Sequence, residues 1–229
     1  MRYQLREDLS CCAVDGCMIF LDIAQDRYFK LTQPLENAMR CFQAHEGVAY
    51  PLLENLAAAG ILVKTSDDLE ARAGIANIQR PSRSAIEQAS VIGNRRLSMT
   101  VIFEVTAIVW STRRQLRTRT FKANLDEAGA YRDRETGTRD IATSTALEDN
   151  LLRVCWQFAR ARRYVPVEPT CLLDSLSLLR FLSRRGLSAN IVLGVTSKPF
   201  AAHCWVQAGD MVLNETVSDA HAYAPIRVV

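Results

Sequence analysis

Three side chains in the last third of the sequence could together perform nucleophilic catalysis. They are the thiol of Cys171, the imidazole of His203 and the carboxylate of Glu215. A cysteine attacks as its thiolate, and a helix N-terminus or a neighbouring imidazole lowers the pKa of a thiol. A carboxylate that accepts a hydrogen bond from the second ring nitrogen fixes the tautomer of the imidazole. In this order, the three groups are the parts of a cysteine hydrolase or acyltransferase site.

The surrounding sequence predicts elements that could bring these groups together. A helical pattern begins at Cys171, directly after a proline and a threonine, so the thiol would lie at a helix N-terminus. A strand is predicted over 189–197. A hairpin with its turn at 208–210 then places His203 and Glu215 on paired strands, where they can face each other.

Each of these residues also has an ordinary structural interpretation. Buried cysteines are common as small apolar side chains, and a lone histidine often serves only as a hydrogen-bond partner. Asp210 and Asp219 are alternatives to Glu215 as the third member of the site. We expect Cys204 to point away from His203 and to belong to the core.

The sequence of residues 1–65 predicts a small separate domain. Residues 1–31 have strand patterns, with a turn at Asp15-Gly16. Two short helices are then predicted, from Pro34 to a break at Gly47 and from Tyr50 to Gly60. Strands followed by short helices in so few residues predict a winged-helix-like module.

The sequence after residue 65 predicts a linker followed by a larger domain. Residues 66–97 lose periodicity and are assigned to a linker with some helical content. The second domain, over 98–229, begins with helical patterns over 98–122 and 146–162. Residues 124–145 are polar and receive no prediction.

Composition narrows the possible functions. The chain has 229 residues, 48% hydrophobic and 23% charged, with a net charge of +3, and this fits two globular domains. The most apolar run, 99–110, is shorter than the roughly 20 residues of a membrane span and predicts a buried helix. Seven cysteines without a disulfide pattern, and no signal peptide, predict a cytoplasmic protein.

Two further classes of site are disfavoured. Residues 1–63 carry five basic and eight acidic side chains, a net of −3, so the winged-helix-like module is not expected to bind nucleic acid. The arginine-rich run at 113–119 is interpreted as a solvated helix face or a docking surface. No pair among Cys11, Cys12, Cys17 and Cys41 has the spacing of a structural zinc site, and no metal is predicted.

A family resemblance sharpens the prediction over residues 165–216. The run from Thr170 to Leu182, then Phe200-Ala-Ala-His-Cys-Trp-Val and Val212-Leu-Asn-Glu215, resembles the transglutaminase-like cysteine peptidases of lasso-peptide biosynthesis, the B proteins. The resemblance implies that Cys171 is the nucleophile, His203 the base and Glu215 the acid, where the family normally has Asp. It implies an α+β chain with a transglutaminase-like (papain-like) domain that needs no metal or organic cofactor.

The N-terminal part resembles the PqqD-like domain that binds precursor leader peptides. The resemblance implies that the leader adds as a strand along 26–31 and contacts a groove beside the helix over 50–61. The candidate leader-binding residues are Tyr28, Phe29, Leu52, Leu53 and Leu56. The implied function is a leader peptidase whose partners are a lasso precursor peptide and an asparagine-synthetase-like lasso cyclase. The alternative is a non-catalytic scaffold that presents the precursor to that cyclase.

Overall fold

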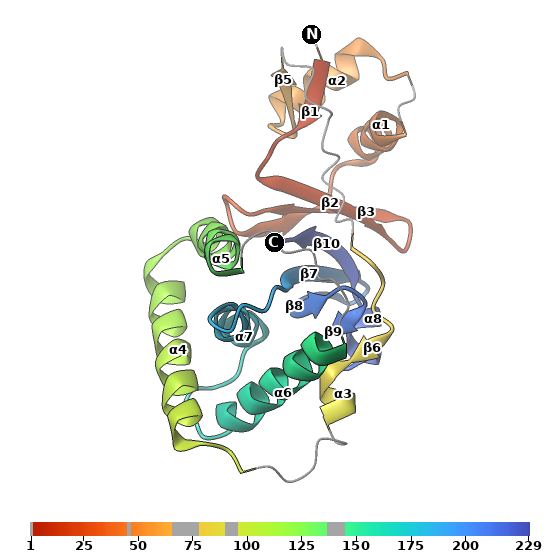
Figure 1. Cartoon of the computed structure of the whole chain (residues 1–229). Helices are drawn as coiled ribbons and strands as arrows, with labels where there is room; N and C mark the ends of the chain where they lie inside the picture. The colour runs from red at the N-terminus through yellow and green to blue at the C-terminus, as the bar shows by residue number, and fades with distance from the viewer. Residues whose placement is uncertain (1, 45–46, 66–77, 90–95, 137–144) are drawn as a thin grey trace.

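The computed structural model describes residues 2–44, 47–65, 78–89, 96–136 and 145–229, and it has an α+β fold (Figure 1). The N-terminal part contains, in chain order, β1 (Arg2–Leu5), β2 (Leu9–Val14), β3 (Cys17–Asp22), β4 (Arg27–Phe29), α1 (Gln33–Gln43), α2 (Tyr50–Ala58) and β5 (Leu62–Thr65).

The N-terminal elements follow the predicted order of strands and then helices. β2, β3 and β4 form an antiparallel sheet, while β1 pairs with β5 in a separate two-stranded sheet. Asp15 and Gly16, which join β2 to β3, both have positive φ, as a two-residue hairpin turn requires. α1 ends at Gln43, before the predicted break at Gly47.

The sheet formed by β2, β3 and β4 is buried on both faces. Met18 and Phe20 of β3 belong to a core beneath α1 and α2. Ile19 and Leu21 alternate with them and, together with Ile23, belong to the core of the C-terminal part. Successive side chains of a strand point to opposite faces, so this one sheet joins the two cores.

The C-terminal part is a sheet covered by helices. It contains β6 (Arg83–Ser84), α3 (Ala85–Ala89), α4 (Met99–Thr118), α5 (Phe121–Thr136), α6 (Thr145–Arg162), α7 (Cys171–Ser183), β7 (Asn190–Ser197), β8 (Phe200–Ala208), β9 (Met211–Val212), α8 (Val217–His221) and β10 (Ala224–Val228). The strand order is β10-β7-β8-β9-β6, antiparallel except for β9 and β6. Figure 1 shows α7 between the sheet and helices α4, α5 and α6.

Part of the predicted linker over 66–97 belongs to this sheet. β6 lies parallel to β9, and the Arg83 guanidinium binds the carboxylates of Asp210 and Glu148. Ala85, in α3, is buried in the larger core. Residues 66–77 and 90–95 of the predicted linker lie outside the described residues.

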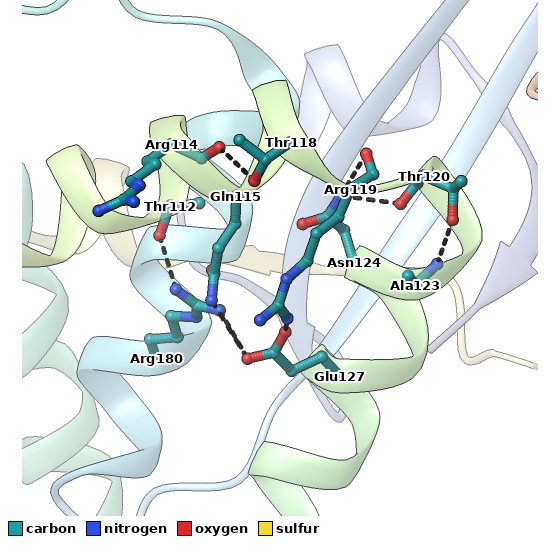
Figure 2. A network of polar contacts seen from close by, with 10 residues as sticks. All are labelled: Thr112, Arg114, Gln115, Thr118, Arg119, Thr120, Ala123, Asn124, Glu127 and Arg180. Atoms are coloured by element: carbon teal, nitrogen blue, oxygen red, sulfur yellow. Dashed lines mark hydrogen bonds and ion pairs between the residues drawn. The ribbon is translucent and has the colours of Figure 1, made fainter.

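The helix predicted over 98–122 is α4, which ends at Thr118, and a second helix, α5, begins at Phe121 after a break at Arg119 and Thr120. The Thr120 hydroxyl accepts a hydrogen bond from the Ala123 amide at 3.3 Å, which explains the new start. α5 was not predicted because it has few apolar residues. It buries Leu125 and Ala128 in the larger core. Polar contacts add to this packing: Glu127 of α5 binds Arg119, Gln115 of α4 (3.2 Å) and Arg180 of α7 (3.5 Å) (Figure 2).

The apolar run at 99–110 is an amphipathic helix and not the buried one predicted. Val105 and Val109 are fully buried, whereas Met99, Phe103 and Trp110 are 62%, 69% and 49% exposed. No helix within the described ranges is long and apolar enough to cross a membrane.

Candidate active site

Cys171 is the first residue of α7, as predicted. Thr170 before it is in an extended conformation and forms the N-cap. Arg162 holds the chain that leads to this point, since its guanidinium donates to the Val165 and Val167 carbonyls at 3.4 and 2.9 Å. The same guanidinium pairs with Asp174 in the first turn of α7 at 2.8 Å. The half-buried thiol therefore has a fixed backbone and lies where a helix has unpaired N–H groups.

His203 and Glu215 are in direct contact, as the sequence predicts. The distance between His203 Nε2 and Glu215 Oε1 is 3.0 Å. This contact occupies Nε2, and hydrogen bonding with the Cys171 thiol is the largest influence that raises the pKa of the imidazole. The ring lies beside Tyr223, with centroids 5.1 Å apart, and beside Trp205, at 6.5 Å. The imidazole is thus oriented by a carboxylate and enclosed by two aromatic rings.

Glu215 reaches His203 from a loop and not from the predicted strand over 211–215. β9 ends at Val212, and the Asn214 side chain then replaces the backbone ladder by accepting from the Val206 amide at 2.7 Å. The Glu215 carbonyl accepts a hydrogen bond from the Ser84 hydroxyl at 2.6 Å. These contacts place the longer glutamate side chain within reach of the imidazole. Ser84 lies in the predicted linker, so its role was missed.

The two alternative carboxylates have other partners. Asp210, in the β8–β9 turn, binds Arg83 and the Ser82 hydroxyl at 2.8 and 2.6 Å. Asp219, in the first turn of α8, accepts a hydrogen bond from the Thr216 hydroxyl at 2.7 Å. Of the three predicted carboxylates, the structure brings Glu215 to His203.

The electrostatics of the site favour a thiolate next to an imidazolium. Hydrogen bonds from Cys204 and His203 lower the pKa of Cys171 to about 4, against the effect of partial burial. Hydrogen bonds to Cys171 and Glu215 raise the pKa of His203 to about 9. Because the two groups titrate together, these values describe the pair. At a pH between these two values, Cys171 is a thiolate and His203 is a protonated imidazolium.

Cys204 has a role beyond the expected place in the core. It is 2% exposed, and the Ser175 hydroxyl donates to its carbonyl at 3.3 Å. Its thiol donates to the Ser175 hydroxyl at 3.8 Å, and hydrogen bonding by this thiol is the largest influence that lowers the pKa of Cys171. The nearby Cys171 thiolate and burial in turn raise the pKa of Cys204. Cys204 therefore remains a protonated donor, which residue type and spacing alone did not indicate.

A cavity of about 310 Å³ opens beside Cys171, His203 and Glu215. Its apolar lining comes from α3, α6 and the segment after β9, and it includes Ile86, Phe158, Ala159 and Leu213. A second cavity of about 370 Å³ shares part of this lining and is bordered by Arg160 and Arg163. Together they form a mainly apolar space large enough for a short peptide segment.

The candidate leader-binding residues differ in their burial and in the core that they pack against. Leu56 is completely buried in the N-terminal core, and Leu52 and Leu53 of α2 pack partly against it. The Phe29 ring stacks on Phe20, with centroids 5.3 Å apart, so it too packs against this core. Tyr28 points the other way and packs against the C-terminal core. Leu56 is a correction: its burial makes it a core residue and not part of an accessible groove.

All seven cysteines are free thiols. Within the ranges that the structure covers, no three His, Cys, Asp or Glu side chains come together as they would to hold a metal ion.

Comparison with known proteins gives two matches. A family model described as the transglutaminase-like superfamily matches residues 99–228. A segment of 45 residues is 42% identical to the microcin J25-processing protein McjB of Escherichia coli, and it spans 20% of this chain and 22% of that protein. No solved structure matches the chain. The two matches confirm the resemblance to the lasso-peptide B proteins, over a short segment in the second case, and neither bears on the PqqD-like resemblance of residues 1–65.

Proposed function

This chain belongs to the transglutaminase-like superfamily, and from that premise we propose that it is the leader peptidase of a lasso-peptide pathway. It hydrolyses the peptide bond between the leader and the core of a precursor peptide. The observation that carries the proposal is the arrangement of Cys171, His203 and Glu215, with a 3.0 Å contact between the last two. The partial match to McjB, a microcin J25-processing protein, supports the substrate class.

The proposed reaction uses each group of the site once in each half-reaction. The Cys171 thiolate attacks the carbonyl carbon of the last leader residue, and N–H groups at the start of α7 stabilise the oxyanion. The His203 imidazolium gives its proton to the leaving α-amine, so the C–N bond breaks and a leader thioester forms. Neutral His203 then takes a proton from water, which attacks the thioester and releases the leader acid.

Glu215 serves the imidazole and not the substrate. Its carboxylate accepts a hydrogen bond from Nε2, so Nδ1 is held toward the thiol, and its negative charge stabilises the imidazolium. Glutamate is longer than the aspartate normally found in the family. The loop conformation, fixed by Asn214 and Ser84, accommodates the extra methylene.

The N-terminal part supplies leader recognition in this proposal, as a PqqD-like domain. The leader adds as a strand to β4, the last strand of its sheet, whose outer edge pairs with no described strand. Main-chain hydrogen bonds then supply affinity, and side-chain pockets supply selectivity. The released core amine becomes the substrate of a partner cyclase of the asparagine-synthetase-like class.

The test is cleavage of a leader–core peptide by the purified protein, read by mass spectrometry with and without the cyclase. Wild-type protein is expected to release the intact leader and the intact core. Cys171→Ala is expected to abolish cleavage and to keep leader binding, whereas Cys41→Ala, a control at a partly buried thiol of α1 outside both cavities, is expected to retain cleavage. Cleavage that survives in Cys171→Ala would refute the assignment of the nucleophile. Leader binding without cleavage by wild-type protein would favour the scaffold alternative.

A further inference from the structure

A buried serine lies one helical turn after the nucleophile, and the mechanism above does not use it. Ser175 follows Cys171 by four positions in α7, so the two residues lie on the same face of the helix, about 6 Å apart along its axis. The Ser175 side chain is completely buried. A buried hydroxyl is destabilising unless it is hydrogen-bonded, so its partners show what it does.

The Ser175 hydroxyl connects α7 to the strand that carries the imidazole. It donates a hydrogen bond to the Cys204 carbonyl at 3.3 Å. The Cys204 thiol also donates to this hydroxyl, with Sγ 3.8 Å from Ser175 Oγ. Because Cys204 directly follows His203 in β8, these contacts hold the start of α7 against the part of β8 that carries the imidazole.

The same hydroxyl connects α7 to the loop that carries the carboxylate. Asn214, the residue before Glu215, donates from Nδ2 to Ser175 Oγ at 3.0 Å. Its Oδ1 accepts from the Val206 amide at 2.7 Å. A serine hydroxyl has one donor and two acceptor positions, so it can serve both neighbours at once. The bonds run in one direction, from the Val206 N–H through Asn214 and Ser175 to a carbonyl of β8, and each bond in such a chain strengthens the next.

Ser175 therefore lies where the three segments of the active site meet. α7 supplies the thiol, β8 the imidazole and the loop after β9 the carboxylate, and Ser175 Oγ is hydrogen-bonded to residues of the second and third. Two contacts described above act on single segments: Arg162 anchors the first turn of α7, and Ser84 anchors the loop. Loss of the Ser175 hydroxyl would thus remove a direct link from the helix of the nucleophile to both other segments.

A second serine of the same helix shows what burial alone gives. Ser177 is also completely buried, but within the described part of the chain its hydroxyl has no hydrogen-bond partner. α7 therefore tolerates a buried serine that belongs to no network. Ser177 matches Ser175 in residue type, helix and burial, and it lacks the contacts to β8 and to the loop after β9.

We propose, building on the leader-peptidase function above, that Ser175 is a positioning residue for the thiol, the imidazole and the carboxylate. Its hydroxyl sets the start of α7 at a fixed distance from β8 and from the loop after β9 before any substrate binds. It acts through Cys204 and Asn214 and not on the substrate. Removing the hydroxyl lets the nucleophile shift relative to its two partners, and a displacement of about 1 Å can slow an enzyme reaction about 100-fold.

The test compares Ser175→Ala with its matched control, Ser177→Ala. In Ser175→Ala, kcat for the leader–core peptide is expected to fall about 10- to 100-fold, while the affinity for a fluorescent leader peptide, measured by anisotropy, is unchanged. The pH profile of Cys171 alkylation by iodoacetamide is expected to move to higher pH, because the thiolate loses part of its hydrogen bonding to His203 and Cys204. A loss of stability alone would not move this profile in folded protein. Ser177→Ala is expected to match wild type in all three measurements.

Asn214→Ala, at a half-buried position, provides a second test that remains informative if Ser175→Ala does not fold. It removes the donor to Ser175, so it is expected to lower kcat and to move the alkylation profile in the same direction. When both variants fold, the double variant is expected to lose less kcat than the product of the two single losses, because both act on one chain of hydrogen bonds.

The outcomes separate this role from the proposed function. A wild-type kcat or a wild-type alkylation profile in folded Ser175→Ala would overturn the proposal, as would the same result in Asn214→Ala if Ser175→Ala does not fold. Fully multiplicative losses in the double variant would also overturn it. Absence of cleavage by wild-type protein would instead overturn the leader-peptidase function, and the alkylation profiles, which need no substrate, would still test Ser175.

Discussion

Replacement of Cys204 tests the origin of the reactivity of Cys171. The Cys204 thiol, which also contacts the Ser175 hydroxyl at 3.8 Å, is the donor with the largest effect on the low pKa of Cys171. Cys204→Ala removes this donor and keeps the backbone N–H, His203 and the helix N-terminus. The pKa of Cys171 is therefore expected to rise in this variant, while the thiolate–imidazolium pair is retained.

The size of the change follows from the nature of the lost contact. A hydrogen bond to a charged group contributes about 1.5–3 kcal/mol, and the lower end applies because Cys171 is half-buried and partly screened by water. At 1.36 kcal/mol per pKa unit, the expected rise is about 1 unit. From a starting value of about 4, the thiolate fraction at pH 5 falls from about 90% to about 50%.

The assay is the alkylation rate of Cys171 by iodoacetamide as a function of pH, followed by peptide mapping because the chain has seven cysteines. In wild-type protein the rate is expected to fall as the pH drops through about 4, where the thiolate takes up a proton. Cys11→Ala, at a fully buried thiol of the other core, is the matched control for lost packing. An identical pH profile in wild type and folded Cys204→Ala would refute the role of the second thiol.

Two further variants test the imidazole and its surroundings. Glu215→Gln is expected to lower kcat by about 10²-fold without weakening leader binding, because the imidazolium loses its negative partner. Asp210→Asn, which loses only contacts to Arg83 and Ser82, is the control. A larger loss of kcat in Asp210→Asn than in Glu215→Gln would contradict the assignment. Gly194→Ala is expected to destabilise the protein by about 1–3 kcal/mol, measured as a lower Tm, because its Cβ would lie 2.7 Å from Trp205 Cζ3 and 2.9 Å from Tyr223 Cβ. An unchanged Tm would show that Trp205 and Tyr223 can shift away from the added Cβ at little cost in stability.

Much of the site could be predicted from the sequence because local patterns place its residues. The proline and threonine before Cys171 and the leucine spacing after it indicate a helix start, and that start alone defines the position of the thiol. His203 follows from strand composition in the same way. The carboxylate was harder, because its position depends on side-chain contacts that replace a strand, namely Asn214 to the Val206 amide and Ser84 to the Glu215 carbonyl.

The features that could not be predicted depend on contacts between distant segments. Ser84 lies in a stretch without periodicity, and it becomes part of the sheet because β9 pairs with it across more than a hundred residues. α5 buries Leu125 and Ala128 in the larger core but has few other apolar residues, and polar contacts of Glu127 to two other helices add to its packing. The strand pairing of Ser84 leaves no periodic signal in the sequence, and α5 leaves only a short one, since hydrophobic periodicity reports only on faces that bury apolar side chains.

The continuous apolar run in β3 shows how the two parts of the protein are related. A strand of an antiparallel sheet with one solvated face alternates apolar and polar residues, whereas Met18 to Leu21 are all apolar. The structure gives the reason, because one face of β3 belongs to each core. Arg227 of β10 adds hydrogen bonds to the Glu7 carbonyl and the Ser10 hydroxyl, at 3.2 and 3.1 Å.

A packed boundary of this kind changes how the leader would be delivered. The sequence predicts that residues 64–90 tether the N-terminal part, so that the leader reaches Cys171 at high effective concentration. A flexible tether would leave the N-terminal part free to move, but removing Ile19, Leu21 and Ile23 from the larger core would expose three fully buried apolar side chains. Each costs about 1.5–3 kcal/mol to expose, so the docked arrangement is favoured over a tethered one. The edge strand β4 then keeps a constant position relative to Cys171, and under the proposed function the fold would set the distance from a bound leader to the scissile bond.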